Sequence, residues 1–316
     1  MILQVATSSE TDGFPMIPCI SQATTMSTSL EADLTAYPKS GWTTIELWLT
    51  KVETYLRDHT VADLRALLDA SGLRAAAASA QGGLLLSRGA ERAAHWEHFR
   101  SRLAVLRELD VPTLVVAVDF NRELKAEDYP LAAASLAEAG ELAGSFGVRL
   151  AVEFQKGAAF CSSLDTTLAL IAQCRSPHVG VCLDLFHYYT GPSKFEDFAY
   201  LDRNNLAWVQ ICDLSGTPRE LAGDGDRIFP GEGDFQIEPI LDHLGAIGYD
   251  GPVSLEVLNP HLWRIPVDRV ADMGYQAVRR TLGRWNRAEP EGSTEAASSR
   301  PDAEAEAQSG GIRGGL

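Results

Sequence analysis

The sequence is short of positive charge. Of its 316 residues, 27 are Lys or Arg and 43 are Asp or Glu, so the formal net charge at pH 7 is −16. Nucleic-acid binding draws much of its affinity from basic side chains that neutralise phosphates, and anionic membrane surfaces also attract basic segments. The charge balance therefore argues against a nucleic-acid partner and against a membrane partner.

Long apolar runs and paired cysteine motifs are also missing. No stretch of about 20 apolar residues is present to span a bilayer, and the first residues lack the basic and apolar segments of a secretory signal. The five cysteines are odd in number and show no C-x-x-C spacing, which disfavours a disulfide framework and a cysteine zinc site. These features predict a cytoplasmic protein with reduced thiols.

The two ends of the chain differ in composition from its middle. Residues 286–316 contain no aromatic side chain and few large aliphatic ones, so they cannot bury enough surface to offset the entropy of ordering. We predict a disordered acidic and glycine-rich tail over 286–316, a flexible extension over 1–15, and one folded unit over 16–285. Met16 directly precedes the first predicted strand and is an alternative start of translation.

Within residues 16–285, short β-rich runs alternate with stretches of helical periodicity. The predicted strands are residues 16–22, 43–49, 73–79, 112–118, 148–154, 178–184, 206–212 and 252–257. The predicted helices include residues 61–70, 92–109, 132–145, 164–174, 237–247 and 267–282. Eight such units over about 270 residues fit a closed (β/α)₈ TIM barrel of the α/β class. An open doubly wound sheet would normally show a glycine-rich turn after its first strand, where this chain has SQATTMST.

Four consecutive predicted strands carry a carboxylate or amide at or near their ends, namely Glu153, Asp184, Gln210 and Glu256. A barrel gathers the C-terminal ends of its strands on one face, and buried unpaired carboxylates are costly there. A cation between them would offset that cost, and an oxygen-only shell suits Mg²⁺, Mn²⁺ or Co²⁺. The alternative is that each residue is simply paired or capped where its strand ends.

Two further residues are expected to face a substrate at this end of the barrel. His187 follows Asp184 by three residues. Arg227 lies in an acidic, glycine-rich loop after the seventh strand, where its guanidinium could bind a substrate oxygen or carboxylate in a bidentate manner. A salt bridge from Arg227 to Glu232 or Asp234 is the other expectation.

Several neighbouring residues are weaker candidates. Lys51 follows the second strand and would either meet an anionic or carbonyl group of the substrate or be a solvated loop charge. Trp48 and Tyr188 are candidate walls against the apolar face of a sugar. Asp213, after the seventh strand, and Glu232 are candidates for residues that lie behind the metal ligands and hold them in place.

The sequence resembles the xylose-isomerase-like barrel superfamily of sugar isomerases, epimerases and related dehydratases. The resemblance rests on VEF at 152–154, CLDLFH at 182–187, VQICD at 209–213, RIFPGEGD at 227–234 and GYDGPVSLEV at 248–257. It implies that Glu153, Asp184, Gln210 and Glu256 bind one divalent metal and that His187 and Arg227 contact the substrate. It also implies a small sugar or polyol substrate and a possible homodimer.

One departure from the family pattern keeps two activities open. Many epimerases of the family have His where this chain has Gln210, and Gln at that position resembles some 3-dehydroshikimate dehydratases. The first activity is isomerisation or epimerisation through an enediolate, with Glu153 and Glu256 removing and returning the proton. The second is a dehydratase of the 3-dehydroshikimate or inosose type, in which His187 protonates the departing hydroxyl. A non-catalytic binding barrel is the third reading.

Overall fold

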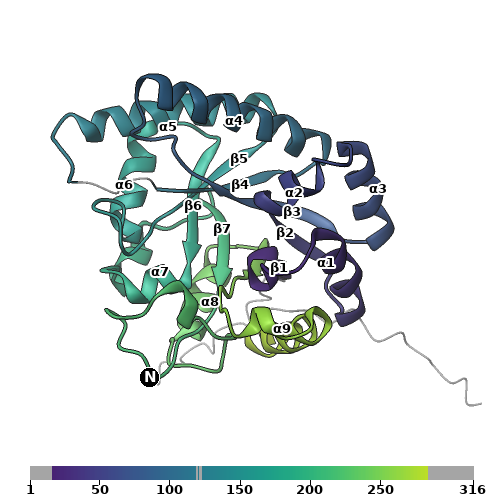
Figure 1. Cartoon of the computed structure of the whole chain (residues 1–316). Coiled ribbons are helices and arrows are strands. Elements are labelled where there is room, and N and C mark those ends of the chain that lie inside the picture. The colour runs from purple at the N-terminus through teal and green to yellow at the C-terminus, as the bar shows by residue number, and fades with distance from the viewer. Residues whose placement is uncertain (1–15, 119, 121–122, 284–316) are drawn as a thin grey trace, which may run out of the picture. The chain divides into compact units, whose positions relative to one another are not determined.

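The computed structural model describes residues 16–118, 120 and 123–283, and these form a closed barrel of eight parallel strands (Figure 1). The strands are β1 (Ile17–Ser21), β2 (Thr44–Trp48), β3 (Arg74–Gln81), β4 (Thr113–Ala117), β5 (Arg149–Glu153), β6 (Val179–Asp184), β7 (Leu206–Ile211) and β8 (Pro252–Leu255). Each strand pairs with the next, and β1 pairs with β8, for example Ile17 with Pro252. The predicted barrel and its eight strands are thereby confirmed.

Helices connect the strands and form the outer ring of the barrel (Figure 1). The α-helices are α1 (Leu30–Ala36), α2 (Leu49–Tyr55), α3 (Val61–Ser71), α4 (Gly89–Glu108), α5 (Asp128–Ser145), α6 (Leu164–Cys174), α7 (Leu185–Thr190), α8 (Ile237–Ala246) and α9 (Val267–Leu282). Short 3₁₀ turns are η1 (Gln22–Thr25), η2 (Pro38–Ser40), η3 (Phe195–Tyr200), η4 (Asp224–Asp226) and η5 (Leu262–Arg264). The six predicted helices are all present.

Helices α2 and α7 are not among the predicted helices. Each begins at the residue directly after a strand, and they are only 7 and 6 residues long. A helix of fewer than two turns shows too little periodicity for its apolar positions to be recognised. Lys51, for which a position in a loop was one expectation, therefore lies on helix α2.

The inside of the barrel is filled by small side chains around one large one. Trp208 packs there with residues from five other strands, which are Cys19, Ala76, Ala77, Val115, Ala151 and Cys182. All five cysteines are buried free thiols, as expected of small apolar residues. A second and larger core lies between the strands and the helices.

The register of the sheet brings the polar strand ends to one level. Asp184 pairs with Gln210 across β6 and β7, and Ala117 pairs with Glu153 across β4 and β5. Glu46 pairs with Ser21 at the end of β1, and Glu256 directly follows β8. We call this end of the barrel, where the strands finish, the C-terminal mouth, and the end where they begin the N-terminal mouth.

No helix in the described part of the chain is both long and apolar enough to cross a membrane. The extension predicted over 1–15 and the tail predicted over 286–316 both lie outside the described residues.

Candidate active site

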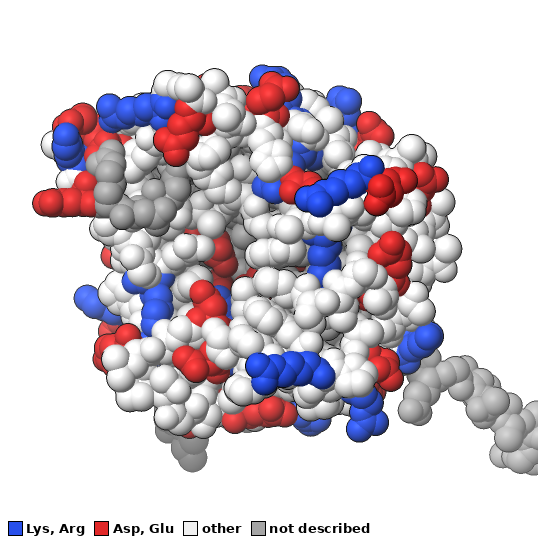
Figure 2. Space-filling model, in the orientation of Figure 1, with Lys and Arg blue, Asp and Glu red and all other residues white. Residues whose placement is uncertain are grey.

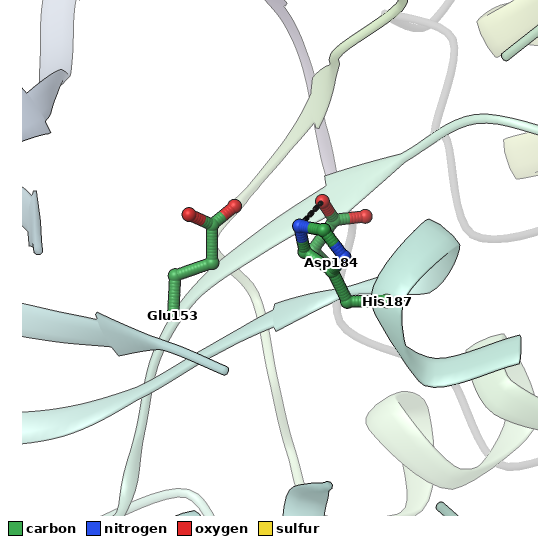
Figure 3. A group of neighbouring side chains, drawn as sticks. All are labelled: Glu153, Asp184 and His187. Carbon is green, nitrogen blue, oxygen red and sulfur yellow. Dashed lines mark ion pairs between the residues drawn. The ribbon is translucent and has the colours of Figure 1, made fainter. Parts of the chain in front are cut away.

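Glu153, Asp184 and His187 form a cluster at the C-terminal mouth (Figure 3). One ligand atom of each lies within 4.8 Å of those of the other two, and all three residues are buried. Asp184 ends β6 and caps helix α7, because its Oδ1 accepts a hydrogen bond of 2.7 Å from the backbone N–H of Phe186. This tight turn returns His187 over Asp184, with 3.8 Å between His187 Nε2 and Asp184 Oδ2.

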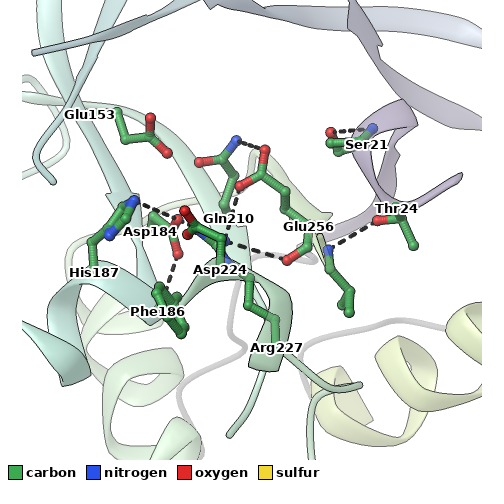
Figure 4. Close-up of polar contacts among 12 residues, drawn as sticks. Ser21, Thr24, Glu153, Asp184, Phe186, His187, Gln210, Asp224, Arg227 and Glu256 are labelled. Carbon is green, nitrogen blue, oxygen red and sulfur yellow. Dashed lines mark hydrogen bonds and ion pairs between the residues drawn. The ribbon is translucent and has the colours of Figure 1, made fainter. Parts of the chain in front are cut away.

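Arg227 is the buried cation of the site (Figure 4). Its Nη1 lies 2.9 Å from Asp184 Oδ2 and 3.0 Å from Glu256 Oε2, and its Nη2 lies 2.9 Å from Asp224 Oδ1. The guanidinium also stacks on the ring of Phe186, 4.5 Å from the ring centroid. These partners replace the salt bridge to Glu232 or Asp234 that was the alternative from the sequence.

Gln210 forms hydrogen bonds with two of the carboxyl groups at this mouth. Its Nε2 donates hydrogen bonds to Glu46 Oε1 at 2.9 Å and to Glu256 Oε1 at 3.0 Å. Its Oε1 accepts a contact of 3.2 Å from Cys182 Sγ. The amide nitrogen, and not the amide oxygen, therefore faces Glu256 in this structure, so the role of Gln210 as a metal ligand stays a prediction.

Four buried carboxyl groups share one buried guanidinium. Burial and the nearby Asp184 carboxylate raise the pKa of Glu153 to about 8. Burial raises the pKa of Glu256 well above its usual value against the opposing effect of Arg227, and burial also raises the pKa of Glu46. The pKa of His187 is lowered by burial, so its imidazole is neutral near pH 7.

These residues fit a divalent cation on the chemistry of their donor atoms. Asp184 Oδ2 is ion-paired with Arg227 but accepts no well-aligned hydrogen bond from the described residues, and His187 Nδ1 is buried with no hydrogen-bond partner among them. The negative charge of the carboxylates exceeds the single charge of Arg227, and a cation offsets such an excess. Carboxylate oxygen and neutral imidazole nitrogen are ligands for several divalent metals.

A cavity of about 130 Å³ opens beside these groups. Its lining includes Glu153, His187, Arg227 and Glu256, with Trp48 on another side. In Figure 2, acidic atoms are visible in a hollow near the centre of the molecular face. The cavity supplies a place where a small polar molecule would meet both glutamates. Trp48 lines it, and its role as a wall against a sugar ring stays a prediction.

Two of the weaker candidates lie elsewhere. Lys51 is buried, with its Nζ 2.6 Å from Asp33 Oδ2 and 2.7 Å from the carbonyl oxygen of Thr25. It is therefore neither a solvated loop charge nor part of the lining of this cavity. Tyr188 is buried against Phe198, with ring centroids 5.1 Å apart, and packs in the helical layer.

The two supporting candidates differ from each other. Asp213 is buried and accepts hydrogen bonds from the backbone N–H groups of Gly231, Gly233 and Phe235, at 3.0 Å each. It thus fixes the loop that follows Arg227. Glu232 is exposed and has no place behind the site.

Glu46 and Asp224 belong to the site but were not among the predicted site residues. Glu46 Oε2 accepts a hydrogen bond of 3.0 Å from Trp208 Nε1, while its Oε1 accepts one from Gln210. A carboxylate inside the apolar run TIELW was a usable signal, of the same kind that identified Glu153. Asp224 gave no such signal, because it lies among several acidic residues of one loop and only its pairing with Arg227 distinguishes it.

A parallel barrel with buried polar groups at its C-terminal mouth has the arrangement in which TIM-barrel proteins carry their active sites. The chain belongs to the xylose isomerase-like TIM barrel family, whose model matches residues 34–298.

Two relatives of known name are similar over different parts of the chain. An inosose isomerase of Halalkalibacterium halodurans is 28% identical over 260 residues, which cover 79% of this chain and 90% of that protein. A 3-dehydroshikimate dehydratase of Pseudomonas putida is 28% identical over 144 residues, 44% of this chain and 22% of that protein. The crystal structure of the IolI protein with a bound zinc atom has the same fold, with a TM-score of 0.80 at 22% identity, and covers 85% of this chain and 99% of that one.

Proposed function

We propose that this protein is a divalent-metal-dependent isomerase or epimerase that acts on a keto-sugar or keto-polyol of the inosose type. The observation that carries the proposal is that Glu153 and Glu256, on strands three positions apart in the barrel, both line one cavity beside Arg227 and His187. The similarity to inosose isomerase over 90% of that protein supports the substrate class.

Glu153, Asp184 and His187 would hold the cation, together with Glu256 after a shift of Arg227. A divalent cation bound there would act as a Lewis acid toward a carbonyl oxygen. The IolI protein, which has the same fold, binds a zinc atom, and this supports a metal in the present protein, while the carboxylate-rich donor set favours Mn²⁺, Mg²⁺ or Co²⁺.

The two glutamates would move the proton. An ionised carboxylate can act as a general base. Without metal, burial raises the pKa of Glu153 to about 8, and a bound cation would lower that pKa and keep the carboxylate ionised. Glu153 would take the proton from the carbon beside the carbonyl, and Glu256 would return one from its own side of the cavity. The reverse assignment of the two residues is chemically equivalent for a reversible epimerisation.

The remaining polar groups would hold the substrate. Arg227 presents a fixed guanidinium fork that can bind two oxygens, and its position is set by Asp224 and by stacking on Phe186. The neutral imidazole of His187 can donate one hydrogen bond to a substrate hydroxyl. Trp48 would pack against the apolar face of the ring.

The second candidate function is a carbon–oxygen lyase. It is favoured by Gln210 at the position where many epimerases of the family have His, and by the partial similarity to 3-dehydroshikimate dehydratase. In that reaction His187, whose imidazole is neutral near pH 7, would first have to gain a proton and would then give it to the departing β-hydroxyl group.

Proton exchange in D₂O tests the proposal. Protein stripped with EDTA is reloaded with Mn²⁺, Mg²⁺ or Co²⁺ and incubated with inososes or ketohexoses while NMR follows the products. We expect an isomeric product that carries one solvent deuterium at the carbon beside the carbonyl. An enone or aromatic product that absorbs ultraviolet light would instead establish the lyase.

Variants of the site make the test specific. Glu153→Gln and Glu256→Gln should abolish deuterium incorporation, and Glu232→Gln, at an exposed glutamate, serves as the matched control. A metal-loaded protein that binds the polyol but exchanges no proton would point to the non-catalytic barrel. The homodimer and the cytoplasmic location stay predictions, and light scattering of the purified protein would measure the first.

A further inference from the structure

We propose that the N-terminal mouth of the barrel binds a small dianion through Arg74 and Arg149. A cavity of about 240 Å³ lies there, lined by the first residues of β3, β4, β5, β7 and β8. It shares none of its lining with the cavity of the proposed active site. The inference therefore goes beyond the proposed function and does not depend on it.

Arg149 is a partly buried charge without a carboxylate partner in the described part of the chain. Its Nη1 donates to the carbonyl oxygen of Leu206 at 3.3 Å, and its Nη2 donates to the carbonyl oxygen of Asn204. Its Nε is buried and bonds to no described residue. The carbonyls position the guanidinium but do not neutralise it, and a buried charge gains when an opposite charge reaches it.

Arg74 adds a second uncompensated charge at the same cavity. Its side chain is exposed and forms no hydrogen bond or ion pair with the residues that the structure describes. Arg203 also lines the cavity, but it is paired with Asp250 through a contact of 2.8 Å between Nη2 and Oδ1. Three arginines and one aspartate leave two positive charges here, in a protein whose net charge is −16.

Small residues keep this end of the barrel open. The lining includes Ala76 and Ala207, and Trp208 lies at the same cavity. Gly180 on β6 lies in the same tightly packed region, because a Cβ atom there would lie 2.7 Å from the backbone oxygen of Asn205, 2.8 Å from Arg149 Nη2 and 2.9 Å from Ala207 Cβ.

The size and charge of the cavity define the ligand class. Its volume is below the roughly 300–1,000 Å³ of sites for drug-sized ligands, so the ligand is small. Two guanidinium groups without carboxylate partners match two negative charges, and each fork suits a group with two acceptor oxygens. The shared chemistry is that of a phosphate or of a short dicarboxylate.

Calorimetric titration of the full chain with inorganic phosphate and with malonate tests the site. The titrations are made without metal and at constant ionic strength, with chloride as the reference anion. We expect one saturable site with a dissociation constant of roughly millimolar or tighter. The tighter of the two probes would identify the source of the anion as a phosphate group or a dicarboxylate.

Three variants distinguish a specific anion site from non-specific electrostatic attraction. Arg74→Met and Arg149→Met should each weaken binding by roughly tenfold or more, because each loses charge-assisted hydrogen bonds. Arg57→Met removes the same charge from an exposed position away from this cavity and should leave the affinity unchanged. Arg74 bonds to none of the described residues, so its variant keeps the test valid if Arg149→Met fails to fold.

Any of three results would overturn the proposal. One is the absence of saturable binding with either probe. Another is equal weakening in Arg57→Met and Arg74→Met, which would mean an adventitious ion only. A crystal soaked in selenate, with its anomalous signal away from Arg149, would lead to the same conclusion.

Discussion

The two mouths of the barrel carry opposite local charge although the same eight strands build both. At the C-terminal mouth, Asp184 and Glu256 pair with Arg227, and Glu153 lies close to Asp184. At the N-terminal mouth, Arg74 and Arg149 begin two strands and face a cavity. The net charge of −16 therefore does not give the local charge at either mouth. The local charge depends on which charged side chains at that mouth lack a partner of opposite charge.

Trp208 lies between the two mouths and touches both environments. Its Nε1 donates to Glu46, which bonds through Gln210 to Glu256 at the C-terminal mouth. The same residue lines the cavity at the N-terminal mouth. The side chain of Trp208 alone thus lies between the two oppositely charged mouths at this point, and small residues pack around it.

The largest expected effect is the loss of proton transfer in Glu153→Gln. The amide keeps the shape of the carboxyl group but cannot take a proton, so we expect kcat to fall by about 10²- to 10⁴-fold. Deuterium incorporation from D₂O measures the step directly. Glu232→Gln should retain full activity, and equal activity of Glu153→Gln and wild type would remove Glu153 from the mechanism.

Replacement of Arg227 should mainly lower the free energy of unfolding. Arg227→Met leaves Asp184 and Glu256 buried without their guanidinium, and we expect a loss of roughly 3–5 kcal/mol in the unfolding free energy of the metal-free protein. Mn²⁺ should restore much of that loss, because it no longer competes with Arg227 for the two carboxylates. Urea unfolding with and without Mn²⁺ measures both quantities. If Mn²⁺ protected the variant less than it protects wild type, the expected competition would be absent.

Substitution of Glu46, which bonds to both Trp208 and Gln210, should have an intermediate effect on activity or metal affinity. Glu46→Gln keeps the bulk of the side chain but replaces one acceptor oxygen by a donor that faces Gln210 or Trp208. We expect kcat or metal affinity to fall by roughly 10- to 100-fold, as is typical when a group that orients a ligand is changed. Isothermal titration with Mn²⁺ and steady-state rates separate the two. Glu46→Asp, which keeps the charge, should recover part of the loss if the hydrogen bonds are what matters.

The smallest expected effect is a dependence of metal-free stability on pH. The pKa of Glu153 is raised from 4.5 to about 8 in the folded protein, so the folded state binds the proton more tightly than the unfolded state. The resulting stabilisation is complete below pH 4.5 and is lost as pH rises toward 8, by an amount on the order of 1–3 kcal/mol. Glu256 and Glu46 contribute with the same sign.

Chemical unfolding in EDTA between pH 5 and pH 8.5 measures this slope. Glu153→Gln should flatten part of it, and saturating Mn²⁺ should remove it, because the cation favours the ionised carboxylates. A metal-free protein that became more stable as pH rose over this range would contradict the directions of these pKa shifts.

Much of the fold followed from local patterns. Eight β-rich runs predicted eight strands, and six long amphipathic stretches predicted six helices, because each pattern repeats several times within one element. The short helices α2 and α7 were not predicted, because each is too short for its pattern to repeat. Lys51 illustrates the consequence, since a residue expected in a loop is on a helix and paired inside the fold with Asp33.

By itself the sequence determined which chemical groups stand at the ends of the strands, because alternation and strand length fix that from local residues. Only the tertiary structure decided how those groups are paired. It placed Arg227 between Asp184 and Glu256, turned the amide nitrogen of Gln210 toward Glu46, and brought His187 into a cluster with Glu153 and Asp184. The physical reason is that pairing depends on closure of the barrel, which brings together residues as far apart in the chain as Glu46 and Gln210.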